Sequence, residues 1–293
     1  MPVSCAGDFR SPRKATGHLA CGRGLTVKAR LPAPKKYIFS GPTGYHKTPN
    51  SSYLRKVQTH LFFDLDKTLW DFEANSRQTL LEIYHYFKLE SIIPDSSSFI
   101  EAYETHNEQC WAAYQRNEIR KDFLRHQRFF LTLEQFGFKN RTLSKKLANE
   151  YVTLSPLKTQ LRPFAMELIQ ELNGEFPLHI ITNGFQEVQS IKLKASGLEP
   201  YFQQIITSEK AGHKKPSPRI FQHALKRAGA QAEYSWMLGD DWQADVQGAL
   251  NSGLKSIWYN PNNEPMPATN AWQVNCLSKA AQIIRTEHVQ NSH

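Results

Sequence analysis

The stretch LFFDLDKTLW, residues 61–70, places two carboxylates directly after a short apolar run. Residues 59–63 are mostly aromatic and apolar, which predicts a buried β-strand. Alternate residues of an extended chain share a face, so Asp64 and Asp66 converge where this strand ends. Open α/β sheets bind ligands at that end of their strands. The pair therefore predicts a site for a hard cation and carboxylate chemistry, although a lone Asp-x-Asp is also typical of a solvated strand end or a helix cap.

Strands and helices alternate from about residue 161 onward. Helices are predicted at 163–172, 186–196, 218–228, 244–251 and 277–285, and strands at 178–181, 205–207, 236–238, 256–259 and, at an edge, 272–274. This order predicts parallel strands joined by right-handed crossovers, with helices over both faces. The predicted fold class is α/β, a doubly wound parallel Rossmann-like sheet.

An all-helical segment interrupts this pattern. After a predicted tight connector at residues 70–75, apolar residues recur at helical spacing to about residue 155. We expect about four helices here, one beginning near Asp95 and one ending at Gly137. The expected domains are a tail at 1–56, an α/β core at 57–72 and 156–293, and a helical insert at 73–155.

The net charge of +9 comes from the first 56 residues. They hold eleven Lys and Arg and one acid, Asp8, which leaves residues 57–293 with 25 basic and 26 acidic side chains. Six Gly, six Pro and the lack of a sustained period predict disorder in this tail. Three accounts of it stay open: an inert tail or start-site artefact, an organelle transit peptide, or a basic tether for nucleic acid.

The composition favours a folded protein without a membrane span, kept in a reducing compartment. A hydrophobic content of 40% is enough for a folded core, and no apolar run approaches the ~18–20 residues of a membrane span. The four cysteines stand far apart without a Cys-x-x-Cys pair, which favours a reducing compartment. We therefore expect a cytoplasmic protein with no membrane partner, with organelle import through the basic tail as the alternative.

Residues suited to catalysis stand at four places that follow a predicted strand or precede a predicted helix. They are Asp64 with Asp66, Thr182, Lys215, and Asp240 with Asp245. The carboxyl ends of parallel strands gather along one edge, so we expect these side chains to lie together. Carboxylates, a hydroxyl and a lysine supply the nucleophile, the cation ligands and the positive charge that phosphoryl transfer needs.

These residues resemble the four motifs of the haloacid dehalogenase superfamily, in the family's order. The matching segments are Asp64-Leu65-Asp66-Lys67-Thr68, Thr182-Asn183-Gly184, Lys215-Pro216 and Gly239-Asp240-(x4)-Asp245. Each motif alone is weak, but four in order are specific, and the similarity covers residues 57 to about 290. It implies a haloacid dehalogenase-like core, and the helical insert resembles the superfamily's type-1 cap.

The resemblance implies that Asp64 is the nucleophile, which would form an aspartyl-phosphate. Asp66 would protonate the leaving oxygen and then activate water. Dehalogenases of the superfamily have no acid at this position, because a halide leaves without a proton. The presence of Asp66 therefore favours phosphate transfer over dehalogenation.

For the other motifs the resemblance implies phosphate and metal binding. Thr182, the amide of Asn183 and Lys215 would hold the phosphoryl group. Lys215 is preferred to its neighbour Lys214 because it stands directly before the proline of the motif. Asp241 could compete as a metal ligand, but we interpret it as a helix N-cap. The implied Mg²⁺ ligands are Asp64, the carbonyl of Asp66 and Asp240, with Asp245 as a support for Lys215 or for a metal-bound water.

Within the superfamily, three stretches are most similar to the noncanonical pyrimidine 5′-nucleotidase (YjjG-type) family. They are residues 64–75, 184–189 and 215–221. The similarity implies removal of the 5′-phosphate from pyrimidine nucleoside monophosphates. Trp70, Phe72 or Trp111 could stack on a pyrimidine ring, but aromatic residues at helical spacing are more often core. His106 and Asn107 could contact the sugar or the base, but exposed polar residues of a helix are usually only solvated.

Alternatives to a Mg²⁺-dependent nucleotidase stay open. A sugar-phosphate phosphatase or a phosphomutase of the same fold would use the same residues, and a mutase would release no free phosphate. A nucleic-acid-associated protein would instead depend on the basic tail, with binding that salt weakens. The near-neutral remainder of the chain and the full catalytic set disfavour that class. The expected partner is a small phosphorylated substrate, such as a nucleoside monophosphate.

Overall fold

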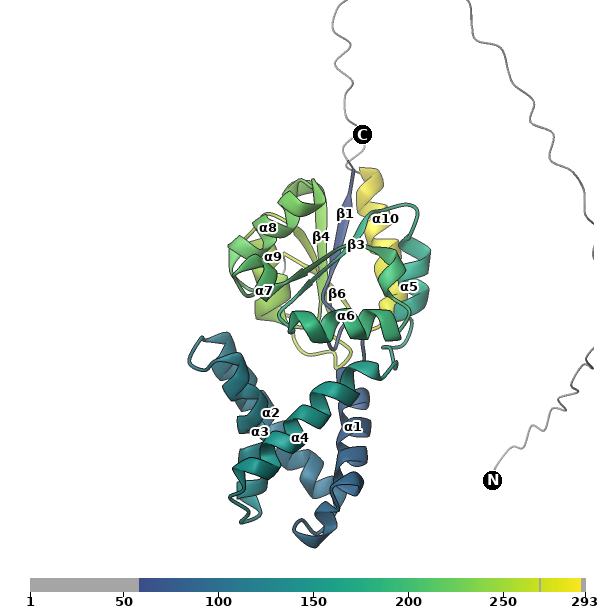
Figure 1. Cartoon of the computed structure of the whole chain (residues 1–293). Coiled ribbons are helices and arrows are strands. Elements are labelled where there is room, and N and C mark those ends of the chain that lie inside the picture. Colours follow the sequence, from purple (N-terminus) through teal and green to yellow (C-terminus); the bar gives the residue numbers. More distant parts are fainter. Residues whose placement is uncertain (1–57, 269, 291–293) are drawn as a thin grey trace, which may run out of the picture. The chain divides into compact units, whose positions relative to one another are not determined.

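The computed structural model describes residues 58–268 and 270–290 (Figure 1). The predictions for the tail at 1–56 fall outside these residues. Within them, six strands form one parallel sheet in the order β3-β2-β1-β4-β5-β6. The strands are β1 (His60–Phe63), β2 (Leu178–Thr182), β3 (Phe202–Thr207), β4 (Ser235–Gly239), β5 (Lys255–Tyr259) and β6 (Trp272–Val274).

Helices connect the strands and cover both faces of the sheet (Figure 1). The α-helices of the described residues are α1 (Phe72–Tyr86), α2 (Ser96–Gln115), α3 (Lys121–Gln135), α4 (Arg141–Leu154), α5 (Ala165–Leu172), α6 (Gln186–Ala195), α7 (Ser208–Ala211), α8 (Pro218–Ala228), α9 (Gly248–Leu250) and α10 (Ala280–Gln290). The predicted fold class, a doubly wound parallel α/β sheet with an all-helical insert, is confirmed.

Successive side chains of β1 point to opposite faces of the sheet and so pack into two different cores. Leu61 and Phe63 point into a core shared with α5 and α10, while Phe62 points to the other face, where it packs with residues of α8 and α9. Successive residues of a strand face opposite sides, so a continuous apolar run serves both layers at once. From β1 the chain adds β2 and β3 on one side and β4, β5 and β6 on the other. The strand order thus reverses between β1 and β4, which is where such sheets bind ligands.

The helices α1 to α4, called the cap helices below, form the insert between β1 and β2 and have a core of their own. The ring of Tyr103 packs against Phe129 and Tyr151 at centroid distances of 4.7 and 5.4 Å. Asp95 caps α2 as predicted, because its Oδ1 accepts a hydrogen bond from Ser98 N. The helix α3 ends at Gln135, two residues before Gly137, whose φ is 83°.

Several predicted boundaries are wrong. The strand β3 begins at Phe202, three residues before its predicted start. Residues 72–75 belong to α1 and not to a connector, because Asp71 accepts a hydrogen bond from Ala74 N and caps the helix at Phe72. The helix predicted at 244–251 begins earlier, as the π-helical turn η5 (Trp242–Gln247), and α9 follows it. The short helix α7 was not predicted at all.

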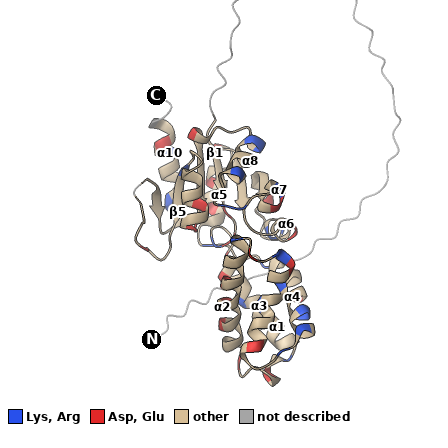
Figure 2. Cartoon of the chain, turned by 90° about the vertical axis from the view of Figure 1, so that its left-hand side faces the viewer, with Lys and Arg blue, Asp and Glu red and all other residues tan. Residues whose placement is uncertain are grey.

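Lys and Arg occur together with Asp and Glu on the sheet domain and on the cap helices (Figure 2). This mixture agrees with the near balance of 25 basic and 26 acidic side chains in residues 57–293. Among the described residues, every helix is too short or too polar to cross a bilayer.

Candidate active site

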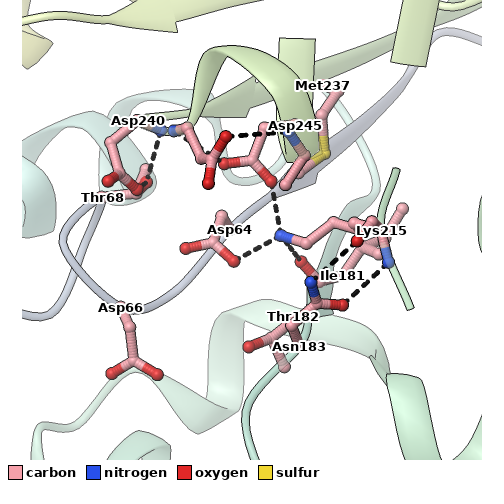
Figure 3. A network of polar contacts seen from close by, with 12 residues as sticks. Asp64, Asp66, Thr68, Ile181, Thr182, Asn183, Lys215, Met237, Asp240 and Asp245 are labelled. Atoms are coloured by element: carbon pink, nitrogen blue, oxygen red, sulfur yellow. Dashed lines mark hydrogen bonds and ion pairs between the residues drawn. The ribbon is translucent and has the colours of Figure 1, made fainter. Parts of the chain in front are cut away.

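Lys215 joins two of the predicted carboxylates at the carboxyl ends of the central strands. Its Nζ lies 2.5 Å from Asp64 Oδ1 and 2.5 Å from Asp245 Oδ1, and it donates to Ile181 O at 2.8 Å (Figure 3). The lysine is 3% exposed, Asp64 is 7% exposed and Asp245 is 1% exposed. Asp64 is therefore part of a buried ion triad and not a solvated strand end.

The local backbone places this triad. Asp64 N donates to Leu238 O at 2.9 Å, which continues the pairing of β1 with β4 by one residue. Asp245 comes from η5, directly after β4. A Cβ at Gly239 would lie 2.2 Å from Asp245 Oδ2, so only glycine leaves room for this carboxylate.

Asp240 adds a third carboxylate. It offers a ligand oxygen that lies, with those of Asp64 and Asp245, in a group whose members are all within 4.8 Å of one another. Thr68 Oγ1 donates to Asp240 Oδ1 at 2.8 Å and accepts from Asp240 N at 3.0 Å, which fixes the side chain. Among the described residues the carboxylate of Asp66 is not a member of this group. The prediction assigned Asp66 to the metal through its backbone carbonyl only.

Burial raises the pKa of all three acids. It raises the pKa of Asp64 to about 7, with Lys215 opposing and Asp245 adding to the effect. Burial and the charge of Asp64 raise the pKa of Asp240 to about 7, and burial raises the pKa of Asp245 to about 6 against the pull of Lys215. Burial alone would lower the pKa of Lys215, but Asp245 and Asp64 raise it above its ordinary value. One ammonium thus faces three carboxylates, so the site has an excess of negative charge. Because all the potential ligand atoms are oxygens, the site fits a hard cation such as Mg²⁺.

Asp66 is held by a different pair of side chains. Its Oδ1 accepts from Lys192 Nζ at 2.5 Å and its Oδ2 accepts from Gln189 Nε2 at 2.6 Å. Figure 3 shows the carboxylate directed away from the ion triad. Gln189 Nε2 also donates to Thr182 Oγ1 at 3.0 Å, so this amide connects the predicted proton donor to the predicted phosphate-binding hydroxyl.

Gln189 and Lys192 lie outside the four motifs, although Gln189 ends the stretch 184–189 that resembles the nucleotidase family. Both are buried on the face of α6 that also buries Leu193. The Lys192 ammonium lies 4.0 Å from the centroid of the Trp70 ring. A lysine is almost never fully buried unless it is paired, and here Asp66 supplies the partner.

Thr182 ends β2 and Asn183 follows it, next to the loop that carries the lysine. Asn183 Nδ2 donates to Lys215 O at 3.0 Å and its Oδ1 accepts from Lys215 N at 2.8 Å, so the side chain fixes that loop. Thr182 Oγ1 accepts from Gly184 N at 3.0 Å. A Cβ at Gly184 would lie 1.6 Å from Gln189 Nε2, which explains the glycine after Asn183.

The contacts distinguish Lys215 from Lys214 as the partner of Asp64, and they show whether Asp241 is a helix cap. Lys214 does not reach Asp64, because its Nζ binds Asn117 Oδ1 at 2.9 Å and the carbonyl of Tyr114 at the end of α2. Asp241 is an N-cap as interpreted, since its Oδ1 accepts from two backbone N–H groups of η5 at 2.9 and 2.8 Å.

All seven predicted site residues line one cavity of about 320 Å³. This volume is in the range of small-molecule sites. The cap helices supply most of the remaining wall, including Phe72, Asn107 and Trp111. Trp70 does not line the cavity and is fully buried, so it is core. The cavity therefore joins the acids of the sheet to side chains of α1 and α2.

The chain is similar to several known proteins. The model of the haloacid dehalogenase-like hydrolase family matches residues 59–253. The pyrimidine 5′-nucleotidase YjjG of Escherichia coli is 30% identical over 227 residues, which cover 76% of this chain and 96% of that protein. The N-acylneuraminate-9-phosphatase of Rattus norvegicus is 30% identical over 228 residues, which cover 71% and 87%. The crystal structure of the HAD-hydrolase YfnB from Bacillus subtilis bound to magnesium has a TM-score of 0.70 and 28% identity, and covers 78% of this chain and 100% of that one.

Proposed function

Because the chain belongs to the haloacid dehalogenase-like hydrolases, as its four motifs predicted, we propose that it hydrolyses phosphate monoesters through an aspartyl-phosphate on Asp64. The observation that carries the proposal is the buried triad of Asp64, Lys215 and Asp245 beside Asp240. It combines a nucleophile, a fixed cation and spare carboxylate oxygens at one point, which is what phosphoryl transfer requires.

In the proposed reaction, an oxygen of Asp64 attacks the phosphorus and the bond from phosphorus to the leaving oxygen breaks. Asp66, in its protonated form, gives its proton to that leaving oxygen. Lys215 holds Asp64 in place and sets positive charge beside the phosphoryl oxygens. Water then attacks the phosphorus of the aspartyl-phosphate, Asp66 takes a proton from that water, and phosphate leaves with Asp64 restored.

We propose Mg²⁺ as the cofactor of this site. Asp64, Asp240 and the carbonyl of Asp66 would hold it, with Asp245 keeping Lys215 in position. Mg²⁺, when bound, would neutralise negative charge on the phosphoryl oxygens. Burial raises the pKa of Asp64 and of Asp240, and the charge of Asp64 adds to the effect on Asp240. A bound cation would offset this cost of ionising the two carboxyls, which supports the proposal. The magnesium-bound structure of YfnB supports it as well.

The proposed substrate is a pyrimidine nucleoside monophosphate. The similarity to the pyrimidine 5′-nucleotidase YjjG, which spans 96% of that protein, supports this choice. A sugar phosphate is the second candidate, because the N-acylneuraminate-9-phosphatase is equally similar at 30% identity. Both candidates need the same chemistry, and they differ in what the cap helices must recognise.

Phosphate release from a panel of monoesters tests the proposal. The panel holds UMP, dUMP, dTMP, ribose 5-phosphate and N-acylneuraminate 9-phosphate, each with Mg²⁺ and with EDTA. We expect Mg²⁺-dependent release with the highest kcat/KM on a pyrimidine nucleotide. Preference for a sugar phosphate would replace the substrate and keep the chemistry. No release from any compound would contradict the phosphomonoesterase assignment.

A further inference from the structure

Asn107 is a buried polar residue of the cap helices that the proposed reaction does not use. It lies on α2, is 6% exposed and lines the same cavity as the catalytic residues. Its Oδ1 accepts a hydrogen bond from Arg128 Nη1 at 2.7 Å. A guanidinium has donors and no acceptor, so the amide oxygen must face Arg128 and Nδ2 must point elsewhere. Nδ2 has no hydrogen-bond partner within residues 58–268 and 270–290, so it is free to donate to a molecule bound in the cavity that Asn107 lines.

Arg128 fixes this orientation. It is 4% exposed, and its guanidinium carbon lies 4.8 Å from the ring centroid of Tyr151 and 5.4 Å from that of Tyr103. Aromatic faces attract a cation, which holds the guanidinium between the two rings. In the described part of the chain no carboxylate forms a salt bridge with Arg128, so Asn107 Oδ1 is the acceptor that compensates its charge. A charged donor on Oδ1 polarises the amide and makes Nδ2 a stronger donor.

Trp111 stands one helical turn after Asn107 on the same face of α2 and lines the same cavity. Its ring stacks on Phe185 at a centroid distance of 5.2 Å and an angle of 24°, and it meets Tyr114 edge to face at 5.6 Å. These contacts hold the Trp111 ring in one orientation at the side of the cavity. The cap side of the cavity thus presents a flat aromatic group and, beside it, one oriented N–H donor.

We infer that Asn107 determines specificity by donating a hydrogen bond from Nδ2 to a ring carbonyl of the substrate, whose ring packs beside Trp111. This inference rests on the proposed nucleotidase function and names its ligand class, a keto-pyrimidine base. Uracil and thymine are flat and carry carbonyl acceptors, which an oriented donor selects. A sugar phosphate without a base lacks the flat ring that would pack beside Trp111. Arg128 is then a positioning residue that acts through Asn107.

Asn107→Asp tests this inference. Aspartate keeps an oxygen for Arg128 and replaces the Nδ2 donor with an acceptor, which repels a carbonyl. The measurement is kcat/KM with Mg²⁺ for dTMP and for 2-deoxyribose 5-phosphate, which is the same molecule without its base. We expect kcat/KM for dTMP to fall ~10–100-fold, mainly through KM, because the lost contact is made equally in the bound substrate and the transition state. The value for 2-deoxyribose 5-phosphate should change less than about 2-fold.

Gln109→Glu is the matched control. It makes the same amide-to-acid change on α2 at an exposed residue that does not line the cavity, so both substrates should keep their wild-type kcat/KM. Equal losses on both substrates for Asn107→Asp, or no loss on dTMP, would overturn base recognition by Asn107 while the wild-type preference for dTMP still supports a nucleotidase. A wild type that hydrolyses dTMP no better than 2-deoxyribose 5-phosphate would refute the nucleotidase proposal, and base recognition with it.

Discussion

Lys192 and Asp66 form a partly buried ion pair, with Nζ 2.5 Å from Oδ1, although they are 126 residues apart in the chain. The side chain of Lys192 is 5% exposed and that of Asp66 is 25% exposed. Gln189 holds the second oxygen of Asp66 at 2.6 Å. The orientation of the proposed proton donor is therefore set by α6 and not by the motif that contains Asp66.

Lys192→Met should lower kcat about 10-fold and leave KM nearly unchanged. Methionine keeps the apolar stem beside Trp70 but removes the ammonium that orients Asp66, and proton transfer depends on that orientation more than substrate binding does. Lys192→Arg should recover part of kcat. Steady-state kinetics of phosphate release from UMP gives both constants, and Lys194→Met, on the exposed face of α6, is the matched control. An unchanged kcat together with a lower melting temperature would indicate a purely structural lysine.

Asp64→Asn should reduce phosphate release by roughly 10³-fold or more, since an amide oxygen is a poor nucleophile. The variant should also be more stable than the wild type in EDTA. Burial raises the pKa of Asp64 to about 7, so ionisation costs folding free energy as the pH rises from 3.8 to 7, and at pH 8 this cost is fully present. Lys215 keeps Asp245 and the Ile181 carbonyl as partners in the variant. Thermal unfolding at pH 8 measures the gain, and near wild-type turnover by a phosphatase-free preparation would rule out the mechanism.

Magnesium should raise the melting temperature of the wild type, because a ligand that binds only the folded state stabilises it by about 2.7 kcal/mol at a hundred times its Kd. Asp240→Asn should reduce this shift, since it removes one of three acids grouped within 4.8 Å. Asp241→Asn is the control, because that neighbouring acid is exposed and caps η5. Thermal unfolding in MgCl₂ and in NaCl of equal ionic strength separates binding from screening. A wild type with no magnesium-specific shift would contradict the metal site.

Stability should fall on mild acidification through His179. This residue of β2 is 1% exposed, and its Nε2 lies 3.0 Å from His60 Nδ1. Burial, assisted by His60, lowers the pKa of His179 from 6.5 to about 4. Between these two values the unfolded chain binds a proton that the folded chain does not. The free energy of unfolding therefore falls by about 3 kcal/mol as the pH drops from 6.5 to 4.

Urea unfolding of the wild type and of His179→Gln at pH 7, 5.5 and 4.5 isolates this contribution, because all other titrating groups are common to both proteins. The variant should lose less stability than the wild type over that interval. Parallel pH dependences in the two proteins would show that His179 does not bind its proton as expected.

The grouping of the seven predicted site residues was predictable because each stands at or just after the carboxyl end of a strand, or near the start of a helix that follows one. A parallel sheet brings those ends to one edge, so Asp64 and Lys215, 151 residues apart, meet at 2.5 Å. The glycine at 239 and the N-cap at Asp241 follow from equally local rules.

Lys192, Gln189 and Arg128 could not be found in this way, and Asn107 was expected to be exposed although it is buried. Each is a polar residue of a helix, and in the sequence such a residue is indistinguishable from a solvated one. Which face a helix buries depends on segments far away in the chain, such as Asp66 for Lys192. Local spacing predicts that a helix forms, and only tertiary packing decides which of its polar side chains reach a cavity.

Because the cap helices are inserted between β1 and β2, the residues proposed for the chemistry and those proposed for substrate recognition lie in separate segments of the chain. The carboxylates and the lysine sit on the sheet, where any change disturbs a crowded arrangement of charges, whereas α2 can vary without touching them. A duplicated gene for such a protein can therefore diverge in the molecules it degrades while its phosphate chemistry is retained. For the same reason, exchanging this one contiguous segment between relatives is a direct way to transfer substrate preference in the laboratory.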